Sequence, residues 1–229
     1  MIPLSDDPGQ RHLFPFITIS LIAINVLAFF YELSLSESQL GELFEAAGVT
    51  PYELTSGNDL VPFAPLGSVY VTLLTSMFLH SGFLHIGSNM LYLWVFGDNV
   101  EDAVGHLPYL VFYLLCGLVA TLVHVAFSLG SSVPTIGASG AIAGALGAYI
   151  VLHPHALVRT AVFIGPFISF PRVSAYIVIG LWFVLQLLSG VLSLGAESEQ
   201  SGGVAVWAHV GGFVAGFALI HAFRQRRDA

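Results

Sequence analysis

Long apolar stretches separated by short polar segments run along most of this chain. A helix that crosses the hydrocarbon core of a bilayer needs about 20 mostly apolar residues. Six stretches approach that length and predict membrane-spanning helices at 14–31, 84–96, 107–129, 136–152, 175–194 and 204–223. The pattern therefore predicts an all-α, polytopic membrane protein in which residues 1–229 form a single membrane domain.

Two segments between the predicted spans have a distinct character. Residues 33–68 contain several carboxylates and prolines, so they are predicted to form a long loop outside the membrane. Within this loop, Glu37–Ala47 has the pattern of a short amphipathic helix at the membrane interface. Residues 153–171 are apolar but interrupted by three prolines, which predicts a loop that touches the membrane surface.

The composition agrees with a lipid environment. Only 9% of the residues are charged and the mean hydropathy is +0.85, whereas soluble domains carry about 25% charged residues. A protein surrounded by hydrocarbon needs no solvated exterior. The chain has six arginines and no lysine, so the basic patch needed for binding nucleic acid is absent. The bilayer is the expected partner, and nucleic acid is not.

The arginines orient the predicted bundle. With six spans, both termini lie on the same side of the membrane, together with the loops after the second and fourth spans. All the cationic side chains fall on that side: Arg11, Arg159, Arg172, Arg224, Arg226 and Arg227. Short cytoplasmic segments are enriched in Lys and Arg. Both termini are therefore predicted to be cytoplasmic, and the loop 33–68 to lie outside.

Four of the polar side chains inside the predicted spans stand out: His85, Asn89, Ser139 and His209. Polar groups are costly in a bilayer and usually face the bundle interior, where they have a function. These four belong to the second, fourth and sixth spans, all of which run from outside to inside. Each lies near the outer beginning of its span, and at 1.5 Å per residue a residue about six positions in would sit roughly 9 Å below the outer surface. Three helices are thus expected to bring these groups to one depth.

The residue types favour acyl transfer. A serine hydroxyl becomes a good nucleophile when a base accepts its proton, and a neutral histidine is the usual base. His85, Asn89 and the backbone N–H groups around Ser139, at Gly137 and beyond, are candidate donors to an oxyanion. Because no carboxylate lies in the outer half of a span, we predict a Ser139–His209 dyad, with His209 oriented by packing and other hydrogen bonds.

Small residues recur every fourth position in the two helices of the predicted dyad. Gly140 and Gly144 form such a pair in the fourth span, and Ala208, Gly212 and Gly216 continue the spacing in the sixth. Stripes of this kind let helix backbones approach closely in lipid, which a hydrogen bond between Ser139 and His209 requires.

Four motifs in this order resemble the rhomboid family of intramembrane serine proteases. They are HSGFLHIGSN at 80–89, EDAVG at 101–105, GASG at 137–140 and AHVGGFVAG at 208–216. The resemblance covers most of the chain from about Thr75 to Phe217. It implies a rhomboid-like bundle of the minimal six-span prokaryotic form, in the inner membrane, that cleaves transmembrane protein substrates near the outer face without a cofactor.

The resemblance also implies roles for individual residues. Ser139 would be the nucleophile and His209 the general base, with His85 and Asn89 lining the oxyanion hole. His80, Glu101 and Gly105 match positions with structural roles. The chain departs from many family members at Ala143, where an aromatic residue often packs on the catalytic imidazole, and its long first loop lacks a Trp-Arg pair.

Three other functions are weaker interpretations. A transporter or proton relay would show intramembrane carboxylates or inverted repeats with broken helices. An intramembrane metalloprotease would carry an HExxH helix, and His80 and His85, five residues apart, do not share a helix face; no metal is expected. An inactive rhomboid-like binding protein has typically lost the serine or the histidine, and both are present here.

Overall fold

The computed structural model describes residues 1–7, 9, 11–57, 60, 68–193 and 205–224. Several predictions made from the sequence lie outside these residues. They are the span boundaries at 194 and 204, the stretches 58–59 and 61–67 of the outer loop, and the contribution of Arg226 and Arg227 to the orientation.

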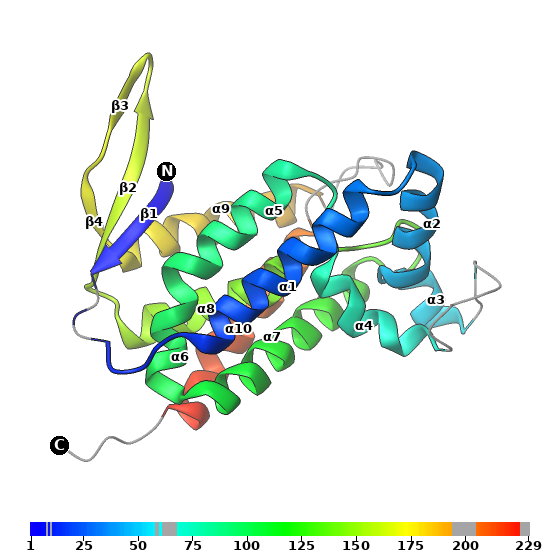
Figure 1. Ribbon diagram of the computed structural model, residues 1–229, viewed down its shortest axis with the longest axis horizontal. Coiled ribbons are helices and arrows are strands. Elements are labelled where there is room, and N and C mark those ends of the chain that lie inside the picture. The colour runs from blue at the N-terminus through cyan, green and yellow to red at the C-terminus, as the bar shows by residue number, and fades with distance from the viewer. Residues whose placement is uncertain (8, 10, 58–59, 61–67, 194–204, 225–229) are drawn as a thin grey trace.

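Each predicted span coincides with a helix or a series of helices (Figure 1). These are α1 (Phe16–Leu33), the continuous series α5 (Phe83–Tyr92), η3 (Leu93–Gly97) and α6 (Asp98–Val104), then α7 (His106–Phe127), α8 (Ser139–Leu152), α9 (Ala175–Ser193) and α10 (Val206–Phe223). The all-α, polytopic membrane fold is confirmed.

The lengths of these helices differ. Among the described residues, α1, α7, α9 and α10 are long and apolar enough to cross a membrane. Val69–Phe78 and Phe83–Val104 form a fifth candidate, bent by 81° at the break between them. Helix α8 is apolar but only 14 residues long. That six helices span the membrane therefore stays a prediction.

The helix of the second predicted span does not end at residue 96 but continues through a π-helical turn and α6 to Val104. The charges that ended the apolar pattern have partners: Asp98 pairs with Arg11, and Glu101 accepts hydrogen bonds from the N–H and hydroxyl of Thr18 at 2.8 and 2.7 Å. The helix ends at Gly105, whose φ of 87° favours glycine. Glu101 thereby ties this end of the series to the start of α1.

The segment between α1 and α5 contains short helices. The predicted amphipathic helix Glu37–Ala47 is confirmed as α2, and it begins with a capping box between Ser36 and Gln39. It is followed by α3 (Pro51–Ser56), η1 (Val69–Val71), α4 (Thr72–Thr75) and η2 (Ser76–Phe78).

The prediction of a loop at 153–171 is wrong, because most of these residues form strands. In this antiparallel sheet, β2 (Leu157–Ile164) pairs with β1 (Ile2–Asp7) on one side and with β3 (Phe167–Ser169) and β4 (Arg172–Ser174) on the other. The three prolines fall outside the strands of this segment. The partner β1 lies at the far end of the sequence, and local patterns do not reveal such a pairing.

Asp6 in β1 anchors the N-terminal strand to the bundle. Its carboxylate accepts hydrogen bonds from the Tyr149 hydroxyl of α8 and from the Asn99 side-chain nitrogen of α6, the latter at 2.8 Å. Burial raises the pKa of the Asp6 carboxyl above its usual range, while the Tyr149 hydrogen bond acts in the opposite direction. The start of the chain is therefore held against the same end of α8 that leads into β2.

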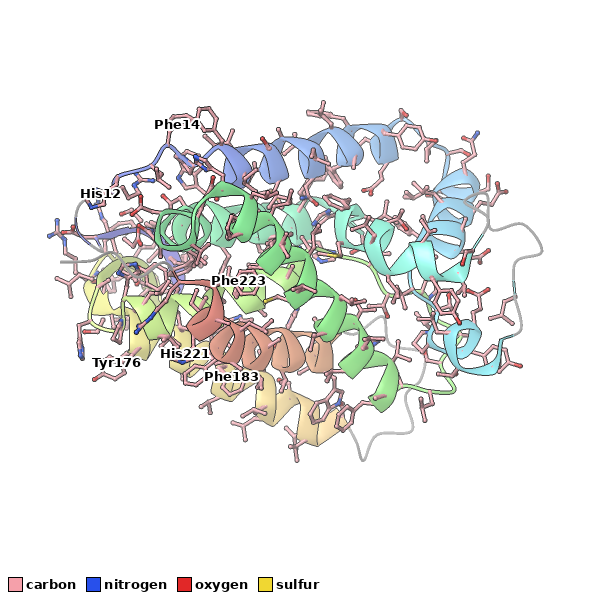
Figure 2. The ribbon with its side chains drawn as sticks, turned by 90° about the horizontal axis from the view of Figure 1, so that it is seen from below. His12, Phe14, Tyr176, Phe183, His221 and Phe223 are labelled. Atoms are coloured by element: carbon pink, nitrogen blue, oxygen red, sulfur yellow. The ribbon has the colours of Figure 1, made fainter. Side chains whose placement is uncertain are left out.

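The two ends of the molecule differ. The sheet, the start of the chain and the end of α10 lie at one end, and α2, α3 and α4 lie at the other (Figure 1). Figure 2 shows His12 and Phe14 before α1, with His221 and Phe223 in the last turn of α10, toward the sheet end. Helix α8 forms the centre of the core, and all its residues from Gly140 to Tyr149 are buried.

Candidate active site

Ser139 is the first residue of α8, and Gly137 determines how the chain enters this helix. Gly137 has φ of 127°, a conformation that favours glycine. Its N–H donates to the Ser76 carbonyl oxygen over 2.8 Å. A Cβ at Gly137 would lie 2.7 Å from His85 Nε2 and 3.7 Å from Ser139 Oγ. Gly137 thus leaves room for the imidazole beside the serine, but its N–H already has an acceptor.

His209, in the first turns of α10, faces Ser139. Its Nε2 lies 2.7 Å from Ser139 Oγ, within hydrogen-bonding distance. His209 is buried, and the whole residue is only 7% exposed. The two residues that the sequence singled out as a dyad are therefore brought into direct contact.

Glycines make this contact possible. A Cβ on Gly212 would overlap the carbonyl oxygen of Gly140, and one on Gly216 would overlap the carbonyl oxygen of Gly144. Helices α8 and α10 therefore pack backbone against backbone along the predicted stripes. Because Gly212 follows His209 by about one turn and Gly140 follows Ser139 directly, this packing controls the distance between the two functional side chains.

Helix α9 contributes two contacts to His209 that the sequence pattern did not predict. Gln186 Oε1 lies 2.9 Å from His209 Nδ1, and the Trp182 ring lies 5.7 Å from the imidazole, centroid to centroid. Trp182 thus provides the aromatic contact to the imidazole that Ala143, which has no ring, cannot provide. Gln186 could have been found by the rule applied to the other spans, since it is the only amide side chain in α9.

The predicted oxyanion residues lie on α5. His85 Nε2 is beside Gly137, and its Nδ1 lies 3.1 Å from the Ser81 hydroxyl. Asn89 follows one turn later and is buried, and its side-chain nitrogen has no hydrogen-bond partner in the described part of the chain. Buried polar groups are normally satisfied, so this amide is a donor available to a bound group.

His80 lies behind His85. It is almost fully buried, its N–H donates to Glu32 Oε1 over 3.1 Å, and its ring packs edge-on against His85 at 5.0 Å. These two contacts join His80 to α1 and to His85. Its ring therefore supports the orientation of the His85 imidazole.

A pocket opens beside Ser139 between α8, the second half of α7, the segment before α5 and the start of α10. Small and apolar residues dominate its lining, which includes Met77, Gly117, Thr121, Ile136, Ala205 and Ala208. Across the described ranges, no three His, Cys, Asp or Glu side chains are grouped so that they could hold a metal ion. The arrangement offers a hydroxyl, a base that touches it and nearby hydrogen-bond donors beside a mostly apolar pocket.

The fold and site define a polytopic α-helical membrane protein with a Ser–His pair inside its helix bundle. Residues 67–226, more than half of the chain, match the family model described as the Rhomboid domain. The chain belongs to the rhomboid family, which confirms the resemblance seen in the sequence motifs.

Individual relatives agree with this membership. The chain is 29% identical over 203 residues to "Rhomboid protease GluP" of Bacillus subtilis, covering 89% of the chain and 34% of that protein. It is 33% identical over 100 residues to "Rhomboid protein 1, mitochondrial" of Saccharomyces cerevisiae, covering 42% of the chain and 29% of the relative. "RHOMBOID-like protein 5" of Arabidopsis thaliana is 31% identical over 147 residues, covering 64% and 42%. The chain therefore spans less than half the length of each of these relatives.

Proposed function

We propose that this protein is an intramembrane serine endopeptidase that hydrolyses peptide bonds of transmembrane proteins near the outer membrane face. Ser139 is the nucleophile and His209 the general base. The observation that carries this proposal is the 2.7 Å distance between Ser139 Oγ and His209 Nε2. A base at this distance can take the hydroxyl proton as the oxygen attacks a carbonyl carbon.

The reaction proceeds in two halves. Ser139 Oγ attacks the substrate carbonyl while its proton moves to His209 Nε2, forming a tetrahedral intermediate with a negatively charged oxygen. His209 then gives the proton to the leaving amine, which departs and leaves an acyl group on Ser139. In the second half, His209 takes a proton from water as the water oxygen attacks the acyl carbon, and returns it to Ser139 Oγ as the acid is released.

The donors to the oxyanion come from two elements. Asn89 has a buried side-chain nitrogen without a partner among the described residues, and the N–H groups in the first turn of α8 have no acceptor within the helix. The His85 imidazole next to Gly137 is the third candidate donor. Gly137 itself contributes space rather than a hydrogen bond, because its N–H is bound to Ser76. Such donors act most strongly where water is excluded.

Gln186 is proposed as the positioning residue that takes the place of a triad carboxylate. If His209 Nε2 accepts the serine proton, Nδ1 carries the hydrogen and donates it to Gln186 Oε1. A neutral amide in this position orients the imidazole and fixes its tautomer, with no additional buried charge.

Replacing Gln186 by leucine is expected to lower kcat about tenfold, the value of one lost hydrogen bond, while KM stays the same. Gln186→Glu, which keeps an acceptor oxygen and the side-chain length, should recover most of the lost rate. Steady-state cleavage kinetics in vesicles measures both values. An equal loss in the two variants, or a change confined to KM, would argue against the positioning role.

We also propose that both termini are cytoplasmic, in the inner membrane of a prokaryote, with six spans in one membrane domain. The arginine distribution supports this orientation. The pairing of β1 with β2 supports a common side for the N-terminus and the segment after α8. The site would then face the outer half of the bilayer, toward the end that carries α2 and α4.

The proposed function is tested by reconstituting the protein in lipid vesicles with a polypeptide that contains one transmembrane helix. The wild-type protein should cut this substrate in or near its helix, and Ser139→Ala should lower the rate by at least about 10⁴-fold. Ser20→Ala is the matched control, because Ser20 lies exposed on α1 and its hydroxyl donates to the Phe16 carbonyl oxygen of the same helix. Binding of the substrate without cleavage by the wild-type protein would instead indicate an inactive, rhomboid-like binding protein.

A further inference from the structure

A hairpin of the sheet stands clear of the helix bundle (Figure 1). It consists of the second half of β2, the turn at Gly165 and Pro166, and β3. Phe163 is 58% exposed, Ile164 64% and Phe167 75%. Since successive residues of a strand point to opposite faces, both faces of the hairpin are apolar, and neither is covered by the described part of the chain.

The amino-acid composition of the hairpin is unfavourable for exposure to water. From Thr160 to Pro171 the sequence contains no charged residue, and the exposed side chains also include Ile168 and Phe170. An isolated two-stranded hairpin is at best marginally stable in water, and a contiguous exposed apolar patch marks a site of interaction with a protein or a membrane. The hairpin therefore requires an apolar partner.

The connections of the hairpin hold it next to the bilayer. Strand β4 leads directly into α9 at Ala175, and β2 follows α8 after a short connection. Helix α9 is one of the helices long and apolar enough to cross the membrane. The base of the hairpin is thus tied to the membrane end of two bundle helices, so the nearest apolar phase is the lipid.

Two arginines lie opposite each other at the base of the hairpin. Arg159 of β2 and Arg172 of β4 are direct partners across the antiparallel pair. Like charges in this position are destabilising. Among the described residues, neither arginine forms an ion pair with a carboxylate. Arginine binds phosphate through paired hydrogen bonds, so an anionic phosphate between the two guanidinium groups would remove the repulsion.

We propose that this hairpin is a membrane anchor that inserts into the lipid leaflet on the side of the chain termini, with phosphates of anionic phospholipids bound at Arg159 and Arg172. The insertion is shallow, because the outer edge of β3 pairs with no described strand and unpaired backbone groups do not enter the hydrocarbon core. The apolar side chains at the turn lie among the upper acyl chains, and the arginines remain at the headgroups.

The test uses a nitroxide spin label at Phe167→Cys in a Cys116→Ala background of the full chain. The protein is reconstituted in phosphatidylcholine vesicles with and without phosphatidylglycerol. With phosphatidylglycerol, the label should be accessible to oxygen and protected from a water-soluble nickel complex. Arg159→Gln and Arg172→Gln should each lower, about fivefold, the ratio of molecules with the hairpin inserted in the lipid to molecules with the hairpin exposed to water. A label at Ser5→Cys, on β1 of the same sheet, is the control and should stay accessible to the nickel complex.

Two results would overturn this proposal. One is a label at residue 167 that is as accessible to the nickel complex as the label at residue 5 in both kinds of vesicle. The other is protection that disappears when the protein is diluted in lipid, which would mean that a second copy of the chain covers the hairpin. Thermal unfolding of each variant in detergent, monitored by circular dichroism, shows that a changed accessibility does not come from a lost fold.

Discussion

Replacing His209 by alanine is expected to lower the rate of peptide hydrolysis by at least about 10⁴-fold while the protein stays folded. The imidazole is the only base in contact with Ser139 Oγ among the described residues, and without it the hydroxyl keeps its proton. Single-turnover cleavage of a transmembrane substrate in vesicles measures this loss. The substitution removes a buried ring but leaves the glycine contacts between α8 and α10 intact.

The matched control for this variant is His221→Ala. His221 is exposed and lies in the last turn of α10 (Figure 2), whereas His209 lies in the first turns of the same helix. Its replacement should leave the rate unchanged. If His209→Ala retained hydrolysis close to the wild-type rate, His209 would not be the base.

Replacing Gly212 by alanine is expected to lower the rate of hydrolysis about 10²-fold, because a displacement of about 1 Å at a reacting pair costs that much. The new Cβ would overlap the Gly140 carbonyl oxygen and lie 2.9 Å from its carbonyl carbon. Since both atoms belong to the backbone of α8, the helices must separate. We also expect a loss of about 1–3 kcal/mol in stability from this overpacking, measured by thermal or denaturant unfolding in detergent.

Gly180→Ala provides the comparison for this substitution. Gly180 lies within α9, and a Cβ there would meet no atom within 4 Å. Alanine also favours helix relative to glycine, so this variant should keep its activity and its stability. If Gly212→Ala behaved in the same way, the close packing of α8 and α10 would not be what sets the spacing of Ser139 and His209.

The sequence predicts most of the helical fold and the pair at its centre. Apolar stretches of membrane length are a strong local signal, so most of the predicted helix ends agree with the observed ends to within a few residues. The candidate site follows from the rarity of polar groups in those stretches. Ser139 and His209 stand out because every neighbouring position is apolar or small. Their contact in the structure agrees with the expectation, while their chemical roles stay a prediction.

Other features depend on contacts that the sequence does not reveal. Whether Gln186 reaches His209 depends on the rotation and crossing of α9, which the apolar pattern of that helix leaves open. The sheet depends on pairing between β1 and β2 from distant parts of the chain. The continuation of the second span through Asp98 and Glu101 depends on partners at the start of the chain, which satisfy charges that would otherwise end a membrane helix.

The central claim is that Ser139 and His209 act as one reacting pair. It is tested most directly by the cleavage rate of the double variant Ser139→Ala/His209→Ala, compared with both single variants and the wild type in the same vesicles. Members of a catalytic unit are strongly non-additive, so the double variant should be no slower than Ser139→Ala alone. Losses that multiply in the double variant, or a wild-type protein that does not cleave, would contradict the account.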